Sequence, residues 1–368
     1  MFEKYRLRNY NFRLVILVMA LCVMGTIIIN SADSSYLRKQ ILGVGICLIG
    51  MLVLSVIDYH FLCKMFIPLY IFNLIMLGLI FVVGYENNGA TRWFKISDSL
   101  TIQPSEFTKV IMVICLATVL AKINTDLNTL RSLALIAAIC AVPVFLVFKQ
   151  PDLSTTIDIF VILFMMIFVA GLSYKLIGIA ILVLIPVAGA FLWYVQTPNQ
   201  VLLTENQLGR VLAFLYPQDY ANTTYQQDNS IMAIGSGMLN GKGLNTSTIA
   251  TVKEANFISE QQTDFIFSVV GEELGFIGCT VIIALIALLV FECIRVARKA
   301  ADKEGMLIAT GVAVWMSFQS FVNIGVATGI LPNTGIPLPF ISYGLSSLVS
   351  SCAGIGLVLN VALQRRKF

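Results

Sequence analysis

The chain has 368 residues, of which 58% are hydrophobic and only 12% are charged. Soluble domains are about 45–50% apolar and roughly 25% charged, so a water-soluble fold of this length could not bury so much apolar surface. The mean hydropathy of +0.88 therefore predicts a protein that folds in lipid. The net charge of +4 is small and scattered, and no basic stripe supports nucleic-acid binding.

Apolar runs long enough to span a membrane follow one another along the chain. They lie near residues 12–30, 40–57, 66–84, 107–121, 133–148, 154–171, 176–195, 265–291, 306–330 and 347–363. The sequence therefore predicts an all-α polytopic membrane protein with about ten transmembrane helices, forming a single integral domain over residues 1–368. The one long polar interval, residues 196–264, is predicted to be a large extracellular loop between helices 7 and 8.

The 24 Lys and Arg residues are shared unequally between alternate connections, and the set that contains both termini carries most of them. By the positive-inside rule, both termini are predicted to be cytoplasmic and the long loop to lie outside. The first apolar run, which follows a basic segment, is predicted to be a signal anchor.

The eight cysteines include no CxxC pair, and all but Cys63 lie in apolar runs. They are predicted to be small buried side chains rather than disulfides or metal ligands. His60, the single histidine, lies beside Asp58 in a short connector and is predicted to be structural or interfacial.

Polar residues gather at the outer membrane ends, first in residues 88–96 and then before the next apolar run. Pro104 suits a first helical turn, and Glu106 and Lys109 are three apart on one helix face, where they can pair. Residues 88–96 could be an interfacial anchor in which Arg92 reaches the headgroups. Lys109, inside an apolar run, favours a functional site instead.

A second polar cluster covers residues 149–156. Asp152 could cap the helix that follows it. Asp158 lies deeper in that helix, where a cap cannot explain it, and is predicted to face the interior of the bundle.

The glycine-rich residues 235–243 of the long loop suggest a phosphate-binding loop, but the spacing does not fit. Gly237 and Gly241 are one residue too close together, and Gly243 stands where a hydroxyl residue should follow Lys242. A nucleotide site is therefore not predicted, although such a backbone could approach a substrate closely.

The long loop ends at Asp264, immediately before the chain returns to apolar sequence. A carboxylate at this boundary can reach water while its partial desolvation makes it a stronger base. The alternative is a helix N-cap, for which an aspartate before a helix is also suited.

Several segments, in this order, resemble the SEDS family (shape, elongation, division and sporulation) of the RodA/FtsW type. They are residues 89–93 (GATRW), 103–106 (QPSE), 150–153 (QPDL), 263–267 (TDFIF) with 272–275 (EELG), and 337–344 (PLPFISYG). They cover nearly the whole chain and are shared by the elongation, division and sporulation branches, between which they do not distinguish.

The resemblance implies a bacterial peptidoglycan glycosyltransferase that polymerises lipid II by inverting hexosyl transfer at the outer face of the cytoplasmic membrane. It implies a class B penicillin-binding protein as partner, with lipid II and membrane lipids as the other binding partners. The family's essential loop aspartate falls on Asp264, and its helix-4 pair falls on Glu106 and Lys109. Relatives often carry histidine at Gln262 and glycine at Leu345, so neither a proton acceptor nor glycine geometry is expected at these positions.

Glycosyl transfer from a lipid pyrophosphate requires a base for the attacking hydroxyl and positive charge for the leaving group. Asp264 is the predicted base. The predicted substrate-binding residues are Arg92, Lys109, Lys149, Arg210, Lys242, Ser342, Tyr343 and Ser346. The predicted supporting residues are Gln103, Glu106, Gln150, Asp152, Asp158, Thr263, Glu272 and Glu273. No cofactor is identified. A divalent cation (Mg²⁺ or Mn²⁺) could share the task with the outer acids Asp152, Asp264 and Glu272, although no spacing identifies a metal site.

Two other classes of function fit the same residues. Buried ionisable side chains in a helical bundle would also suit a lipid II flippase or a proton-coupled transporter, and a non-enzymatic scaffold for cell-wall synthesis is the third reading. A long outer loop is unusual for a carrier and natural for a polymerase that works at the membrane surface.

Overall fold

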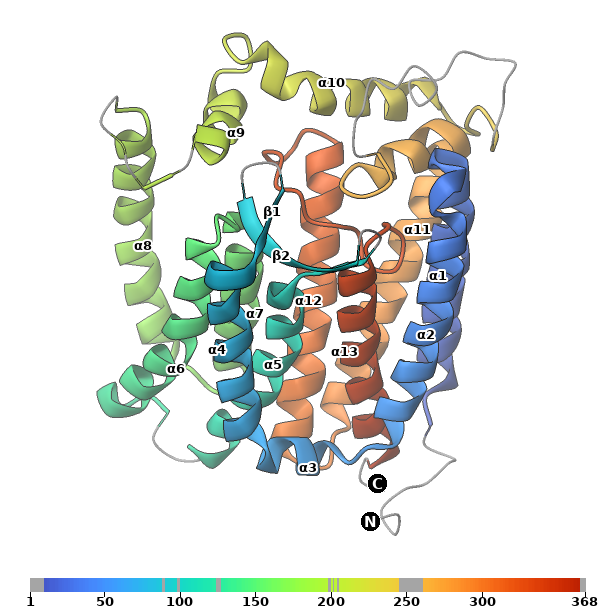
Figure 1. Ribbon diagram of the computed structural model, residues 1–368. Helices are drawn as coiled ribbons and strands as arrows, with labels where there is room; N and C mark the ends of the chain where they lie inside the picture. Colours follow the sequence, from blue (N-terminus) through green and yellow to red (C-terminus); the bar gives the residue numbers. More distant parts are fainter. Residues whose placement is uncertain are drawn as a thin grey trace.

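The computed structural model describes residues 10–87, 90–97, 100–123, 127–197, 200, 202–203, 205–244 and 261–364. Its long apolar helices form one bundle (Figure 1) and coincide with the predicted runs. They are α1 (Phe12–Ala32), α2 (Leu37–Val56), α4 (Phe66–Val83), α5 (Pro104–Lys122), α6 (Leu130–Lys149), α7 (Leu153–Val169), α8 (Tyr174–Val195), α11 (Ile266–Arg298), α12 (Lys303–Ala327) and α13 (Leu345–Leu363). In the described part of the chain, 9 helices are long and apolar enough to span a membrane, and α7 is a shorter apolar helix of 17 residues. The predicted all-α polytopic fold with about ten helices is confirmed.

Helix α1 begins and α13 ends at the same end of the bundle (Figure 1), as an even number of spans requires. A short 3₁₀ helix (Ser34–Tyr36) and helix α3 (Tyr59–Lys64) connect neighbouring spans. The basic segments 1–9 and 365–368, which contribute to the predicted orientation, lie outside the described residues. The predicted cytoplasmic location of the termini therefore stays a prediction.

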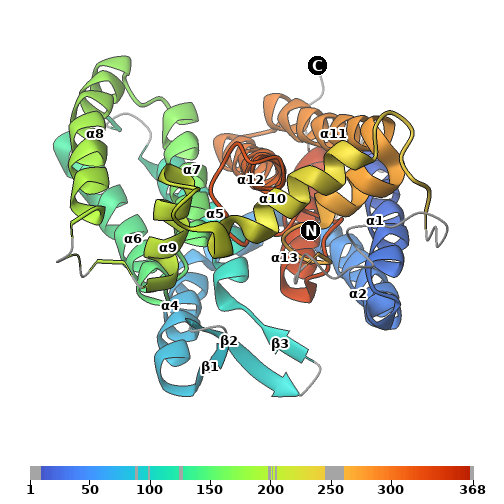
Figure 2. The same cartoon turned by 90° about the horizontal axis from the view of Figure 1, so that it is seen from above.

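The centre of the bundle is formed by α5, α12 and α13, which are buried over most of their length. Helix α8 lies at the periphery (Figure 2), and Val195 is its one buried residue. All eight cysteines are free thiols and seven of them are buried, which confirms their prediction as small core side chains. Leu345 is the first residue of α13, so this position is helical and does not need glycine geometry.

His60 lies in α3 and joins it to the turn before α12, at the end of the bundle where α1 begins. Its imidazole nitrogens lie 2.8 Å from Asp58 Oδ1 and 2.7 Å from Asp302 Oδ2. Asp302 also caps α12 by accepting a hydrogen bond from the Gly305 N–H. The predicted structural role of His60 is confirmed.

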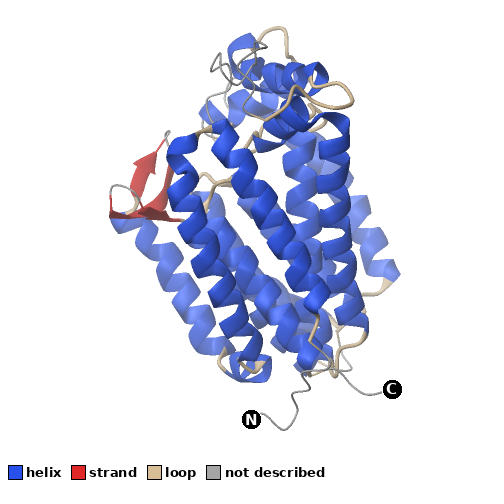
Figure 3. Ribbon diagram, turned by 90° about the vertical axis from the view of Figure 1, so that its right-hand side faces the viewer, coloured by secondary structure: helices blue, strands red, loops and turns tan. Residues whose placement is uncertain are grey.

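A three-stranded antiparallel sheet, which the sequence did not predict, lies at one side of the bundle (Figure 3). Its strands are β1 (Tyr85–Asn87), β2 (Ala90–Ser97) and β3 (Leu100–Ile102), with β2 in the middle. Strand β2 combines a β-branched residue, Thr91, with aromatic residues, which suit a pleated and partly buried surface. Arg92 of this segment forms an ion pair with Asp152, a contact within the protein. The alternative that residues 88–96 lie at the membrane interface stays a prediction.

The polar interval 196–264 contains two helices, α9 (Glu205–Leu215) and α10 (Ala221–Ser236), where only a loop was predicted. Helix α10 lies across the end of the bundle opposite the start of α1, above α11 and α12 (Figures 1 and 2). It is attached to the end of α12 by Gln227, whose amide donates hydrogen bonds to the carbonyls of Val326 and Leu331. Residues 245–260 lie outside the described residues.

Helix α11 is broken at Gly275, whose φ of 64° and ψ of −161° are not helical. The glycine-rich residues 238–243 fit into this break. Four backbone hydrogen bonds join the two segments: Lys242 N to Glu272 O, Gly243 N to Glu273 O, Phe276 N to Met238 O, and Ile277 N to Leu239 O. A side chain at Gly241 would overlap the Glu273 carbonyl. The close approach that the structure shows for this backbone is to α11, and an approach to a substrate stays a prediction.

Candidate functional site

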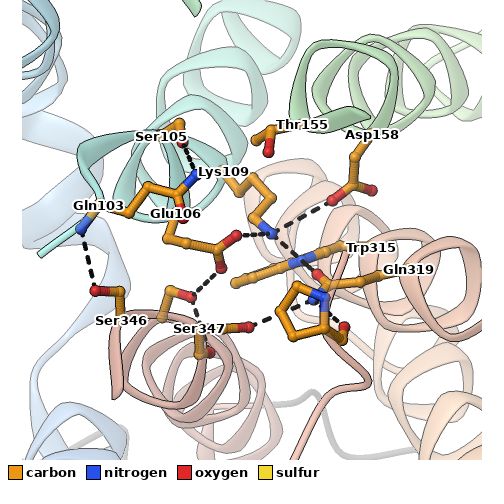
Figure 4. Close-up of polar contacts among 12 residues, drawn as sticks. Gln103, Ser105, Glu106, Lys109, Thr155, Asp158, Trp315, Gln319, Ser346 and Ser347 are labelled. Carbon is orange, nitrogen blue, oxygen red and sulfur yellow. Dashed lines mark hydrogen bonds and ion pairs between the residues drawn. The ribbon is translucent and has the colours of Figure 1, made fainter. Parts of the chain in front are cut away.

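A buried charge cluster joins α5 to α7 near the centre of the bundle (Figure 4). Lys109 Nζ lies 2.9 Å from Glu106 Oε1 and 3.3 Å from Asp158 Oδ2. The Lys109 and Asp158 side chains are 1% exposed and the Glu106 side chain is 5% exposed. The predicted pairing of Glu106 with Lys109 and the inward direction of Asp158 are both confirmed.

Helix α12 completes this cluster with side chains that the sequence interpretation did not select. Gln319 Oε1 accepts a hydrogen bond from Lys109 Nζ at 2.9 Å, and the ammonium lies 4.9 Å from the centre of the Trp315 ring. The Gln319 amide in turn donates to the Pro337 carbonyl at 2.8 Å. Lys109 is thus committed to partners inside the bundle, and Gln319 connects the cluster to the segment that precedes α13.

A second polar cluster surrounds Asp152, the N-cap residue of α7. Its carboxylate accepts hydrogen bonds from Gln103 Nε2 at 2.8 Å, Ser105 Oγ at 3.4 Å and the Thr155 N–H at 3.2 Å. Arg92 Nη1 lies 3.5 Å from the same carboxylate, whose side chain is 2% exposed. The predicted helix cap is confirmed, and it is also the point at which the sheet, α5 and α7 meet.

Three of the predicted polar residues connect helices in this region. Ser346 Oγ accepts a hydrogen bond from the Gln103 N–H at 3.1 Å, which joins α13 to the start of α5. Gln150 Nε2 donates to the Leu77 carbonyl at 2.9 Å and holds α6 to α4. The contacts of Gln150 and Ser346 are thus with the protein itself.

Asp264 belongs to a turn, residues 262–264, whose three consecutive carbonyls all accept hydrogen bonds. The Gln262 carbonyl accepts from the Tyr343 N–H at 2.9 Å and the Thr263 carbonyl from Ser342 Oγ at 2.6 Å. The Asp264 carbonyl accepts from Asn323 Nδ2 at 2.8 Å. Phe265, not Asp264, occupies the N-cap position of α11. The turn is held by α12 and by the segment before α13.

The Asp264 carboxylate and the Arg210 guanidinium approach each other at Gly335, where φ is +74°. A Cβ atom on Gly335 would lie 3.2 Å from Asp264 Oδ2 and 3.7 Å from Arg210 Nη1, so both charged groups lie against this glycine.

Four charged groups from distant segments interact at this end of the bundle. Burial lowers the pKa of Arg210 and the neighbouring Arg92 lowers it further, while Asp264 and Asp152 act in the opposite direction. An arginine stays protonated despite such a shift. The structure therefore places one permanent cation, Arg210, within electrostatic reach of Asp264, and a second, Arg92, within reach of Arg210.

Two predicted cations lie elsewhere. Lys149 is exposed and its Nζ lies 5.7 Å from the centre of the Phe145 ring. Lys242 pairs with Glu272 at 2.7 Å, beside the break in α11. Glu273 accepts a hydrogen bond from Ser31 Oγ, which joins the broken helix to α1.

Two of the three acids that the sequence suggested for a metal ion have cationic partners. Asp152 and Glu272 are engaged by Arg92 and Lys242. In the described parts of the chain, no three His, Cys, Asp or Glu side chains are grouped so that they could hold a metal ion. A divalent cation stays a prediction from the sequence.

The residues that the sequence interpretation missed share one recognisable signal. Trp315, Gln319 and Asn323 are spaced by four residues along α12 and therefore lie on one helix face. All three are buried. Amide side chains repeated at this spacing in a membrane helix mark a face that contacts protein rather than lipid.

The fold and these clusters define a polytopic membrane protein with a charged site at one end of its bundle, and comparison with known proteins identifies its family. Residues 8–367 match the family model of the FtsW, RodA and SpoVE proteins, described as "Cell cycle protein". The chain belongs to this family.

Its relatives include proteins of both the RodA and the FtsW type. It is 35% identical to the peptidoglycan glycosyltransferase MrdB of Escherichia coli K12, over 81% of this chain and 78% of that protein. It is 32% identical to the probable peptidoglycan glycosyltransferase FtsW of Trichlorobacter lovleyi, over 98% of this chain and 95% of that protein.

Two solved structures are similar to this chain over nearly its whole length. The rod shape determining protein RodA of Thermus thermophilus matches with a TM-score of 0.71 and 29% identity, over 98% of both chains. A chain from a study of "polymerization and crosslinking by a peptidoglycan synthase complex" matches with a TM-score of 0.81 and 30% identity, over 96% of this chain and 97% of that chain.

Proposed function

We propose that this protein is a peptidoglycan glycosyltransferase that polymerises lipid II, with Asp264 as the catalytic base. The observation that carries the proposal is the position of Asp264, which lies in a turn held by three carbonyl hydrogen bonds and beside Arg210. Family membership and the activity in the relatives' names support this choice over a carrier or a scaffold.

In the proposed reaction, a hydroxyl of the acceptor sugar attacks the anomeric carbon of the donor. A new carbon–oxygen bond forms as the bond from that carbon to the lipid pyrophosphate breaks. The hydroxyl proton passes to Asp264, and the electron pair of the broken bond leaves with the pyrophosphate. Fixed positioning of the base is effective because a displacement of about 1 Å can cost about 100-fold in rate.

We assign the pyrophosphate to Arg92 and Arg210. Arg210 lies beside Asp264, Arg92 pairs with Asp152, and the two guanidinium groups are within electrostatic reach of each other. Arginine binds phosphate oxygens through paired hydrogen bonds. Lys109 is committed to the buried charge cluster and Lys242 to Glu272, so we assign them structural roles. The predicted divalent cation can be tested by removing divalent cations with a chelator. If the treated enzyme polymerises lipid II as well as the untreated enzyme, a role for a divalent cation is excluded.

The charged site lies at the end of the bundle opposite the start of α1 and the end of α13, so we propose that it faces outward, with both termini in the cytoplasm. The structural relative from a complex that couples polymerisation to crosslinking supports a class B penicillin-binding protein as the partner.

The test is to reconstitute the purified protein with this partner on lipid II and to measure the glycan strands formed. We expect strands from the wild type and none from Asp264→Asn, which keeps the size of the side chain and removes its charge. Asp228→Asn, at an exposed position on α10, is the matched control and should polymerise normally.

Absence of polymer from the wild type, or full activity of Asp264→Asn, contradicts the proposal. Movement of lipid II across the bilayer without polymer would identify a flippase instead.

A further inference from the structure

A shallow cavity of about 360 Å³ lies on the surface of α11, near its C-terminal end. Its lining residues are Phe291, Ile294, Arg295 and Arg298 of this helix and Lys299, the residue that caps it. Their spacing of three and four residues places them on one helix face. Along this face the lining changes from two apolar side chains to three cationic ones.

The apolar part of the cavity faces lipid. Phe291 is 60% exposed and Ile294 is 45% exposed within the protein, although both lie in a membrane-spanning helix. The cationic part lies at the same end of the bundle as the start of α1, because Asn11 donates a hydrogen bond to Glu292. The cavity is thus at a membrane surface, opposite the end that carries Asp264.

The cationic side chains of the cavity carry more positive charge than the described carboxylates around them neutralise. Glu292 pairs with both Arg295, at 3.2 Å, and Arg13, at 3.7 Å. Arg298 and Lys299 form no ion pair with any residue that the structure describes. The C-terminal helix dipole supplies only about half a negative charge, which is less than these two cations carry.

We propose that this cavity binds an anionic phospholipid, with its phosphate between Arg298 and Lys299 and an acyl chain against Phe291 and Ile294. Basic pockets at a membrane surface suit such headgroups, and a guanidinium matches phosphate oxygens geometrically. The volume is within the roughly 300–1,000 Å³ of small-ligand sites. A zwitterionic lipid carries its own ammonium group, which competes for the phosphate, and a free anion gains nothing from the apolar wall. The proposal does not depend on the glycosyltransferase activity.

The test compares the binding of phosphatidylglycerol and phosphatidylcholine to the full-length protein in detergent, by native mass spectrometry. Each cation at such a site contributes roughly fivefold to binding. The double variant Arg298→Gln/Lys299→Gln should therefore lower the preference for phosphatidylglycerol about 25-fold. Arg131→Gln/Lys175→Gln removes two exposed cations from α6 and α8 and should leave the preference unchanged.

Three results would overturn the proposal: no preference for phosphatidylglycerol in the wild type, equal losses in both double variants, or displacement of the lipid by inorganic phosphate alone. Salt provides a second measurement that needs no variant. The preference of the wild type should fall as sodium chloride is raised, and a preference that is insensitive to salt would also contradict the assignment.

Discussion

Replacing Asn323 with alanine should slow polymerisation with little effect on the binding of lipid II. The Asn323 amide donates to the carbonyl of Asp264 at 2.8 Å and to that of Ile336 at 2.7 Å, and the residue is 1% exposed. It is therefore a positioning residue, which joins the proposed base to the segment before α13 without touching the substrate.

The structure sets the magnitude. The buried carbonyl of Ile336 and the part-buried carbonyl of Asp264 lose their donor. An unsatisfied buried group costs about 1–3 kcal/mol, so Asn323→Ala should lower the free energy of unfolding by at least this amount. The Asp264 turn can relieve this cost by moving, and a movement of about 1 Å corresponds to a loss of about 100-fold in kcat. KM should stay within about threefold, because Asn323 makes no substrate contact in the proposed mechanism.

Gln227→Ala is the matched control. Its amide also donates to two carbonyls, those of Val326 and Leu331, at 2.8 and 2.7 Å, but these lie at the end of α12 and not in the Asp264 turn. Both variants should lower the thermal midpoint, and only Asn323→Ala should lower kcat in the lipid II assay. Wild-type kcat in Asn323→Ala, or equal losses of kcat in the two variants, would refute the positioning role.

Two further predictions concern stability. Lys242→Met should lower the free energy of unfolding by about 3–5 kcal/mol, because the Glu272 side chain, which is 2% exposed, loses its cation. The double variant Lys242→Met/Glu272→Met should recover most of this loss. Equal thermal midpoints for the single and double variants would contradict the prediction. The second stability prediction concerns His60, at the opposite end of the bundle. Its hydrogen bond to Asp302 raises the pKa of His60 above 6.5. Burial raises the pKa of Asp302, but the hydrogen bonds of this carboxylate outweigh burial and lower its pKa to about 2. The stability that His60 contributes is then fully present below about pH 6.5 and lost as the pH rises through its raised pKa, so the difference in thermal midpoint between wild type and His60→Gln should shrink from about pH 6 to about pH 9. A difference that is constant over this range would show that protonation of His60 is not involved.

Much of the local structure follows from the sequence. Apolar runs of spanning length predict the helices because lipid requires backbone polar groups to be satisfied within each segment. Pro104 predicts the start of α5, and the spacing of Glu106 and Lys109 predicts their pair, because both depend only on the geometry of one helix. Asp152 predicts the cap of α7 for the same reason.

The sheet and the two helices α9 and α10 were not predicted. Strand β2 depends on pairing with its neighbours, and α10 depends on packing across α11 and α12, so neither is specified by a strong local pattern. The break in α11 at Gly275 was also missed, since its backbone groups are satisfied by residues 238–243, more than thirty positions earlier.

The sequence by itself determined the membrane fold, the family motifs and the choice of Asp264, because these depend on composition and local order. Only the tertiary structure decided which of the other predicted site residues lie in the region around Asp264. Arg210, from a surface helix, lies near Asp264, and Arg92, from a strand, pairs with Asp152, whereas Lys109 is enclosed by Glu106 and Asp158. The physical reason is that a charge takes its role from the groups around it, and in this protein those groups come from segments far apart in the chain.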